Sequence, residues 1–205
     1  DNISGLLGET GFRQYMDQQD TPLETGYLLR IGIDHFKEIN DNFGQEYGDF
    51  VLRKTADCIS GCISEAQKVY KLVADEFLIM DVSSDEVRDA EKLYNKMREE
   101  IGRFIEANEF KVMYTVSGGI VPFGTLGGDQ YSEALKLTDF ALNEAKKLGR
   151  NRCYIYNEET YRRFLRKREI TQELRDAVNN GLQGFTAFYQ PVFAEDKKVP
   201  YGAEA

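Results

Sequence analysis

The order of apolar runs along the chain predicts an α/β (α+β) fold: a palm-like, ferredoxin-type β-α-β-β-α-β antiparallel sheet with helices packed on it. Four runs have the composition of strands, at residues 27–33, 69–73, 77–82 and 112–121. The second and third runs are separated only by residues 74–76, which is short enough for a hairpin. The other two gaps are long enough to hold a helix each.

The predicted helices are segments in which apolar residues recur at helical spacing. Residues 46–62, after a short polar segment, and residues 83–105 fill the two long gaps. In a ferredoxin-type unit both of these helices would cover the same face of the sheet. Further helices are expected at residues 11–19 and 131–148, with a short edge strand at residues 152–155.

The composition excludes several classes of protein. The 205 residues carry a net charge of −9 and are 41% hydrophobic, which fits neither a disordered chain nor a fibre. No apolar run is long enough to cross a membrane, so we expect no membrane contact from this segment. Basic residues concentrate between residues 146 and 168 and leave an acidic body, which argues against nucleic acid as a partner.

The cysteines and the first residue bear on the cellular compartment and on the parent protein. Three cysteines and one histidine form no zinc pattern, and an odd cysteine count without a disulfide framework suits a reducing cytoplasm. The chain begins at Asp1 rather than Met, so we expect a segment of a longer protein whose upstream part can carry a membrane anchor. We therefore expect a cytoplasmic location for this segment.

In a palm-type sheet the end of the first strand and the tip of the hairpin meet at one edge. Two carboxylates at that edge can hold two Mg²⁺ ions on a nucleoside triphosphate. Asp75 and Glu76 lie at the hairpin tip, but the first strand ends on Gly32, Ile33 and Asp34. We interpret Asp34 as the N-cap of a following helix, and the single histidine, His35, as structural.

Four short motifs occur in a fixed order along the chain. Residues 1–6 read DNISGL, residues 33–49 contain IDHFKEIND and a later GD, residues 116–119 read VSGG, and residues 145–151 read AKKLGRN. Together they resemble the GGDEF domain, the family of diguanylate cyclases that join two GTP molecules into cyclic di-GMP. The resemblance covers roughly the first 156 residues.

The resemblance implies a guanine nucleotide site. An amide can serve the acceptor side of guanine, and a carboxylate can accept from its N1–H and amino group. Loop backbone N–H groups and cations can hold the phosphates. The residue types alone leave another interpretation open, because Asn and Asp are common in loops and caps, and Lys and Arg are usually exposed. The residues implied are Asn40 and Asp49 for the base, and Phe36, Lys37, Lys146 and Arg150 for the phosphates.

The chain departs from the family at the catalytic edge. Its signature reads VADEF at residues 73–77, so both glycines are replaced, and Gly32 stands where the family has a metal-binding aspartate. Asp75 matches the position that binds metal and, with Glu76, forms the implied catalytic pair; the alternative for Asp75 is an ordinary turn residue. These departures imply weak or absent Mg²⁺ binding and little cyclase activity.

The tail of the chain carries a second resemblance. Residues 173–177 (ELRDA), 188–192 (FYQPV) and 202–205 (GAEA) are similar to the start of an EAL domain, the cyclic di-GMP phosphodiesterase family. The chain stops before the rest of that domain. The expected organisation is a degenerate GGDEF domain at 1–157, a charged linker helix at 158–180 and a truncated N-terminal EAL fragment at 181–205.

Three functional hypotheses follow from these residues. The first is a nucleotide-binding, catalytically impaired GGDEF domain that regulates an adjacent EAL phosphodiesterase, with GTP and that domain as partners. The second is a weakly active diguanylate cyclase that works as a transient homodimer. The third is an interaction scaffold that binds no nucleotide. The retained base and phosphate residues favour the first over the third, and Gly32 favours it over the second.

Overall fold

The computed structural model describes residues 3–84, 86–107, 110–182, 184–193 and 199–204. The chain divides into two compact units, residues 1–157 and 158–205, which we describe separately.

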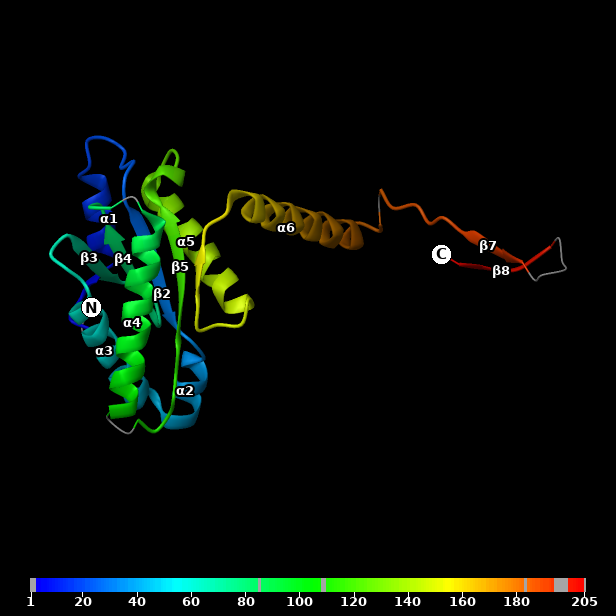
Figure 1. Ribbon diagram of the computed structural model, residues 1–205. Coiled ribbons are helices and arrows are strands. Elements are labelled where there is room, and N and C mark those ends of the chain that lie inside the picture. The colour runs from blue at the N-terminus through cyan, green and yellow to red at the C-terminus, as the bar shows by residue number, and fades with distance from the viewer. Residues whose placement is uncertain (1–2, 85, 108–109, 183, 194–198, 205) are drawn as a thin grey trace. The chain divides into compact units, whose positions relative to one another are not determined.

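The first unit is built on a six-stranded sheet with the order β1-β3-β4-β2-β5-β6 (Figure 1). Strand β2 pairs antiparallel with both β4 and β5, and β3 pairs antiparallel with β4. This is the predicted β-α-β-β-α-β arrangement, and the structure confirms it. The four central strands are β2 (Tyr27–Ile33), β3 (Gln67–Lys71), β4 (Glu76–Asp81) and β5 (Val116–Pro122).

Two short strands extend the sheet at its edges. Strand β1 (Leu7–Gly8) runs parallel to β3, and β6 (Cys153–Ile155) runs parallel to β5. Strand β5 begins four residues after the predicted start at residue 112, because residues 112–115 lie outside the ladder, although the carbonyl of Thr115 accepts from the Asp34 N–H at 2.8 Å.

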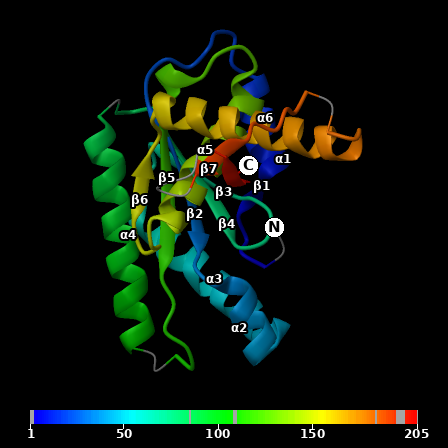
Figure 2. The ribbon, with the colours of Figure 1, turned by 90° about the vertical axis from the view of Figure 1, so that its right-hand side faces the viewer.

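Helices cover both faces of the sheet, so the unit has three layers (Figure 2). Helices α3 (Gln45–Cys62) and α4 (Val87–Ala107) pack on one face, as expected for the ferredoxin-type core. Helices α1 (Glu9–Asp17) and α5 (Gln130–Lys147) pack on the other face, which the predicted two-layer unit left bare. A further short helix, α2 (Phe36–Phe43), occupies the polar segment whose start was expected to be helical but whose extent was not predicted.

The alternation of side chains along β2 and β4 decides which residues meet. Because successive strand residues point to opposite faces, Leu29, Ile31 and Phe77 enter the core beneath α3 and α4. The residues of opposite parity face α1 and α5, and among them are the polar or small residues Arg30, Gly32 and Glu76.

A close contact between backbones fixes the position of α5. A Cβ atom added at Gly119 on β5 would lie 2.3 Å from the backbone nitrogen of Leu142, so only glycine lets the helix lie this near the strand. The C-terminal end of α5, which carries Lys146, is thereby held over the ends of β2 and β4.

The second unit consists of a helix and a hairpin. Helix α6 (Glu158–Asn179) is charged and mostly exposed, with ion pairs one turn apart such as Arg162 to Glu158 at 2.5 Å. Strands β7 (Gln190–Phe193) and β8 (Pro200–Glu204) pair antiparallel. A strand was expected within residues 186–193, whereas β8 was not. Among the described residues, no helix combines the length and apolar character that a bilayer crossing requires.

Candidate functional site

A pocket of about 770 Å³ opens between α2, the start of α3 and the β3–β4 turn. This volume lies within the range of small-molecule sites. The pocket is lined by five of the eight residues that the sequence singled out, drawn from three separate elements. They are Phe36, Lys37, Asn40, Asp49 and Asp75.

The α2–α3 side of the pocket presents an amide beside a carboxylate. A Cβ atom at Gly48 would lie 1.9 Å from Oδ1 of Asn40, so the amide rests against the backbone of α3 where a glycine makes room. Asp49 follows Gly48 directly and is half-buried in the pocket wall. Gly44 joins the two helices with φ +84°, a value that favours glycine. This side therefore offers a donor and several acceptors to one ligand.

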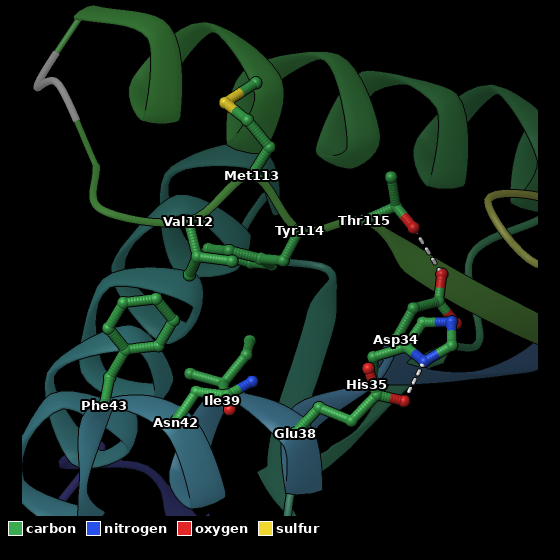
Figure 3. Close-up of a pocket in the computed structure, with 10 residues that line it drawn as sticks. All are labelled: Asp34, His35, Glu38, Ile39, Asn42, Phe43, Val112, Met113, Tyr114 and Thr115. Atoms are coloured by element: carbon green, nitrogen blue, oxygen red, sulfur yellow. Dashed lines mark hydrogen bonds and ion pairs between the residues drawn. The ribbon is translucent and has the colours of Figure 1, made fainter.

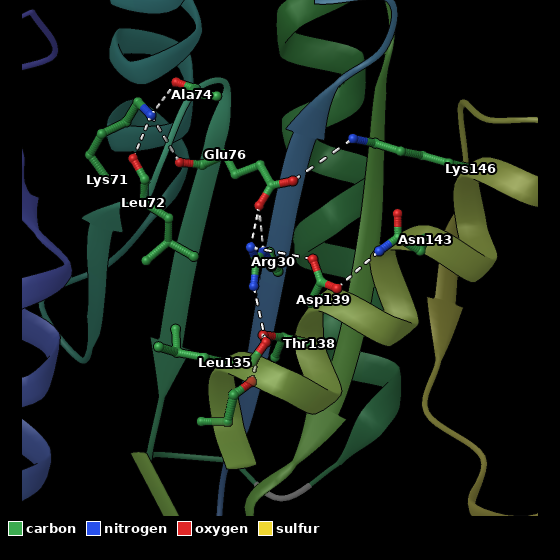
Figure 4. Close-up of polar contacts among 11 residues, drawn as sticks. Arg30, Lys71, Leu72, Ala74, Glu76, Leu135, Thr138, Asp139, Asn143 and Lys146 are labelled. Atoms are coloured by element: carbon green, nitrogen blue, oxygen red, sulfur yellow. Dashed lines mark hydrogen bonds and ion pairs between the residues drawn. The ribbon is translucent and has the colours of Figure 1, made fainter. Parts of the chain in front are cut away.

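The β3–β4 turn forms the opposite side. The Glu76 N–H donates to the carbonyl of Val73 at 3.2 Å, and Ala74 between them has φ +52°. The turn is further bound by the ammonium of Lys71, which donates to the carbonyl oxygens of Leu72 at 2.8 Å and Ala74 at 2.5 Å (Figure 4). Sequence reasoning missed Lys71, which is almost fully buried and also lines the pocket.

Charges near the turn act on each other at short range. Burial lowers the pKa of Lys71, and Asp75 and Glu76 oppose that shift. Burial raises the pKa of Asp75, and the strongest opposing effect comes from the ammonium of Lys146, with a smaller one from Lys71. The Asp75 carboxylate thus lines the pocket within electrostatic reach of two lysines.

Glu76 faces away from the pocket, toward α5. Its Oε2 accepts from Nε of Arg30 at 2.6 Å, and a second guanidinium nitrogen of Arg30 pairs with the same oxygen. Arg30 also donates to the carbonyl of Leu135 at 3.0 Å and lies 3.5 Å from Asp139 (Figure 4). The implied catalytic residue Glu76 is therefore held in an ion pair with a buried arginine, which the sequence reasoning did not single out.

Two other implied phosphate residues also lie outside the pocket lining. Lys146 extends from the end of α5, with Nζ 3.9 Å from Oε1 of Glu76. A Cβ atom added at Gly32 would lie 3.0 Å from the same Nζ, so the lysine fills space that a larger residue would occupy. Arg150 is exposed just after α5, with φ +62°.

Asp34 corrects one expectation. The N-cap position of α2 belongs to His35, at φ +58°, and not to Asp34. The Asp34 side chain is buried and accepts hydrogen bonds from Thr115 Oγ1 at 2.6 Å and Ser117 Oγ at 2.7 Å. It also accepts from the backbone N–H of Asn151 at 3.2 Å. A buried carboxylate needs several hydrogen-bond donors. Thr115, Ser117 and the backbone of Asn151 supply them, so Asp34 does not cap α2.

A second pocket, of about 380 Å³, lies on the other side of α2 (Figure 3). His35 and Glu38 meet there, with Nδ1 2.6 Å from Oε1. The lining contains none of the eight implied nucleotide or catalytic residues. The structure thus separates His35 from the larger pocket.

The donor set at the sheet edge does not fit the two-Mg²⁺ site of a palm-type sheet. Within the described residues, no three histidine, cysteine, aspartate or glutamate side chains converge as a metal site. At this edge Asp75 is the carboxylate of the β3–β4 turn that lines the pocket, Gly32 offers no side-chain ligand, and Glu76 is paired with Arg30. Mg²⁺ requires several oxygen ligands in near-octahedral geometry.

Comparison with known proteins identifies the family. A family model described as diguanylate cyclase, GGDEF domain, matches residues 1–152. The chain belongs to the GGDEF domain family. This GGDEF domain is 31% identical over 145 residues to diguanylate cyclase DosC of Escherichia coli, covering 69% of the chain and 30% of DosC. It is 26% identical over 202 residues to the cyclic di-GMP phosphodiesterase NbdA of Pseudomonas aeruginosa, covering 95% of the chain and 25% of NbdA.

Solved structures agree with this assignment. The GGDEF domain of DgcB from Caulobacter crescentus, in complex with c-di-GMP, superimposes with a TM-score of 0.65 at 25% identity, over 76% of this chain and 94% of that one. The active GGEEF domain of a diguanylate cyclase from Vibrio cholerae gives 0.54 at 28% identity, over 73% and 90%. The chain thus covers most of each of these two solved domains but less than a third of the two curated relatives.

Proposed function

We propose that this GGDEF domain binds a guanine nucleotide, is impaired as a cyclase and regulates an EAL phosphodiesterase domain that follows it in the parent chain. The observation that carries the proposal is the larger pocket. It gathers both implied base residues and two of the four implied phosphate residues, Phe36 and Lys37, while the adjoining strand end lacks a metal carboxylate.

The pocket suits guanine because of its donors and acceptors. The Asn40 amide can donate to the O6 and N7 acceptors of guanine, and the Asp49 carboxylate can accept from N1–H and the amino group. Adenine offers a donor where guanine has O6 and lacks the N1–H, so the same pair discriminates against it. Lys37 and the N–H groups at the start of α2, near Phe36, face the end of the pocket where phosphates would lie.

The cyclase reaction demands more than binding. A 3′-hydroxyl must lose its proton as it attacks the α-phosphorus of a second GTP and displaces pyrophosphate, and the developing charge must be stabilised. We assign the proton acceptor to Asp75, which lines the pocket, because Glu76 is already paired with Arg30. Removing one preorganised electrostatic group commonly lowers the rate by about 10²–10³-fold. We therefore assign weak or absent Mg²⁺ use and little synthesis.

A weakly active cyclase is the second candidate, and the retention of Asp75 in the pocket favours it. In that function two copies would meet as a transient homodimer, each presenting one GTP. The two candidates share the nucleotide site and differ in turnover, so one preparation tests both.

The regulatory part of the proposal rests on the tail. The match to NbdA, which is named a phosphodiesterase, extends over 202 residues and so includes the second unit. Residues 158–180 would then be the linker, and residues 181–205 the first strand region of the EAL domain. The free thiols of Cys58, Cys62 and Cys153 suit a cytoplasmic site of action, where GTP is found.

Calorimetric titration of the chain with GTP, GDP and ATP tests the proposal. We expect GTP and GDP to bind in the micromolar to millimolar range, and ATP at least about tenfold more weakly. Asp49→Asn should weaken GTP binding by about tenfold or more, because the amide cannot accept from both guanine donors. Asp41→Asn, an exposed change on α2 outside the pocket, is the matched control and should bind like the parent.

The outcomes separate the three hypotheses. No heat at millimolar GTP would contradict nucleotide binding and leave the interaction scaffold. Cyclic di-GMP formation from GTP at the rate of an ordinary cyclase, measured by chromatography, would contradict the impairment. Slow but measurable synthesis that Asp75→Asn abolishes would establish the weak cyclase.

A further inference from the structure

Two cations lie at the sheet edge where the donor set does not fit a metal site. Arg30 on β2 and Lys146 on α5 both lie on the α5 face of the sheet, beside Gly32. Figure 4 shows Glu76 pointing between them, with Arg30 on one side and Lys146 on the other.

Both oxygens of Glu76 are engaged by these cations. Oε2 accepts from Nε of Arg30 at 2.6 Å, and Oε1 lies 3.9 Å from Nζ of Lys146. The side chains of Arg30, Glu76 and Lys146 are 9%, 16% and 24% exposed, so little water screens their charges. Asp139 adds a second carboxylate, and the four charges sum to zero.

A divalent cation would have to displace this arrangement. To bind Glu76 it must break a charge-assisted pair with a buried guanidinium and approach two positive groups in a partly desolvated site. A Cβ atom at Gly32 would lie 3.0 Å from Nζ of Lys146, so the ammonium would have to shift slightly to admit a larger residue there. Lys146 thus lies beside the position from which a carboxylate on β2 would extend.

We propose that Arg30 and Lys146 form a built-in cationic pair that replaces the divalent metal, so that the domain binds its guanine nucleotide without Mg²⁺. This inference rests on the proposed nucleotide site. Arg30 neutralises Glu76, so Lys146, which lies outside the pocket lining but acts on Asp75 at its edge, keeps its charge for a phosphate. The ligand class is a free nucleoside di- or triphosphate, with Lys146 and the proposed phosphate residue Lys37 offsetting part of its charge.

The decisive test is a pair of GTP titrations at matched ionic strength, one with Mg²⁺ in excess over GTP and one with excess EDTA. We expect dissociation constants that agree within about threefold. Binding that weakens tenfold or more in EDTA would overturn the inference while leaving the proposed function intact. Absence of binding in both buffers would overturn the two together.

Variants then test the role of each cation. Lys146→Met should weaken GTP binding about tenfold in both buffers, because it removes a cation that acts in place of the metal. Lys147→Met is the matched control: that lysine is the next residue on α5, is largely exposed and pairs with Glu144, and its loss should leave GTP binding unchanged. Unaltered GTP affinity of Lys146→Met in EDTA would contradict the inference.

The double variant Arg30→Met/Gly32→Asp should gain Mg²⁺-dependent GTP binding, which we expect the parent to lack. It frees Glu76 from the guanidinium and supplies a second carboxylate, so GTP should bind at least about tenfold more tightly with Mg²⁺ than with EDTA. Equal binding in both buffers by the folded variant, checked by a thermal melt, would contradict the role given to Arg30. The titrations of the parent chain stand whether or not this variant folds.

Discussion

Arg30 is the residue on which the α5 face of the sheet depends. It lies in the central strand, is nearly buried and bonds Glu76, the carbonyl of Leu135 and Asp139. A buried charge is tolerated only when it is paired and hydrogen-bonded, so these contacts require one another.

A double-mutant cycle measures that dependence. Arg30→Met should lower the free energy of unfolding by about 3 kcal/mol, because it leaves the carboxylate of Glu76 short of its main partner. Glu76→Leu should lower the free energy of unfolding by a similar amount, because it leaves the buried guanidinium of Arg30 short of its main partner. The double variant should return to within about 1 kcal/mol of the parent, since two apolar residues replace a complete pair. Urea unfolding gives the values, and strictly additive losses would contradict the pairing.

Gly48 carries a functional prediction at the same scale. Gly48→Ala places a Cβ atom on the Asn40 amide and should weaken GTP binding by about tenfold or more. Gly61→Ala in the same helix meets open space and should leave GTP binding unchanged. Calorimetry on both variants is the measurement. Equal affinity in the two would show that Asn40 does not contact the nucleotide.

The β3–β4 turn carries Val73 and Ala74 at the two positions where the family signature has glycine. Ala74 adopts φ +52°, a conformation that costs an L-residue about 1–2 kcal/mol relative to glycine. The structure offsets this cost locally, because Lys71 bonds the carbonyl of Ala74. The turn is thus retained although both signature glycines are replaced.

Ala74→Gly should therefore stabilise the domain. The relief of strain exceeds the added freedom of the unfolded chain, so we expect a gain of about 0.5–1 kcal/mol and a rise of about 2 °C in the melting temperature. Val73→Gly is the control, since Val73 is not in the left-handed region and its replacement adds only unfolded-state entropy. A melting temperature raised equally by both variants would refute the strain.

The elements show why some features could be predicted and others not. The four central strands and the hairpin follow from apolar runs and a short gap, which are local signals. The extent of helix α2 was not predicted because the helix is short and polar, and β8 was not predicted because it is short and pairs only with β7. Helices α1 and α5 were predicted as helices, but the face of the sheet that they cover was not, because it depends on contacts between distant parts of the chain.

The site follows the same division. Phe36, Lys37, Asn40, Asp49 and Asp75 could be named from motif spacing, and the structure brings them into one pocket. Lys71 and Arg30 could not be named from the sequence, because the role of a buried charge depends on which groups surround it in the fold. One signal was available: Arg30 interrupts the apolar run YLLRIGI on the strand that ends at Gly32.

At the scale of the whole molecule, the larger pocket belongs to the first unit. Every residue that lines it precedes residue 76, and both hydrophobic clusters lie within residues 1–157. A chain shortened to residues 1–157 should therefore bind GTP within about twofold of the full segment. Calorimetry on both forms checks this. A loss of tenfold or more in a folded, shortened chain would show that the second unit completes the site.

Hydrogen exchange read by mass spectrometry, with and without GTP, tests the central claim that the larger pocket holds the nucleotide. We predict slower exchange on GTP addition in residues 36–49 and 72–75, whose backbone surrounds that pocket, and unchanged exchange in residues 112–115, which line the smaller one. ATP at the same concentration should give a much smaller effect. Protection confined to residues 112–115, or no protection at saturating GTP, would contradict the claim.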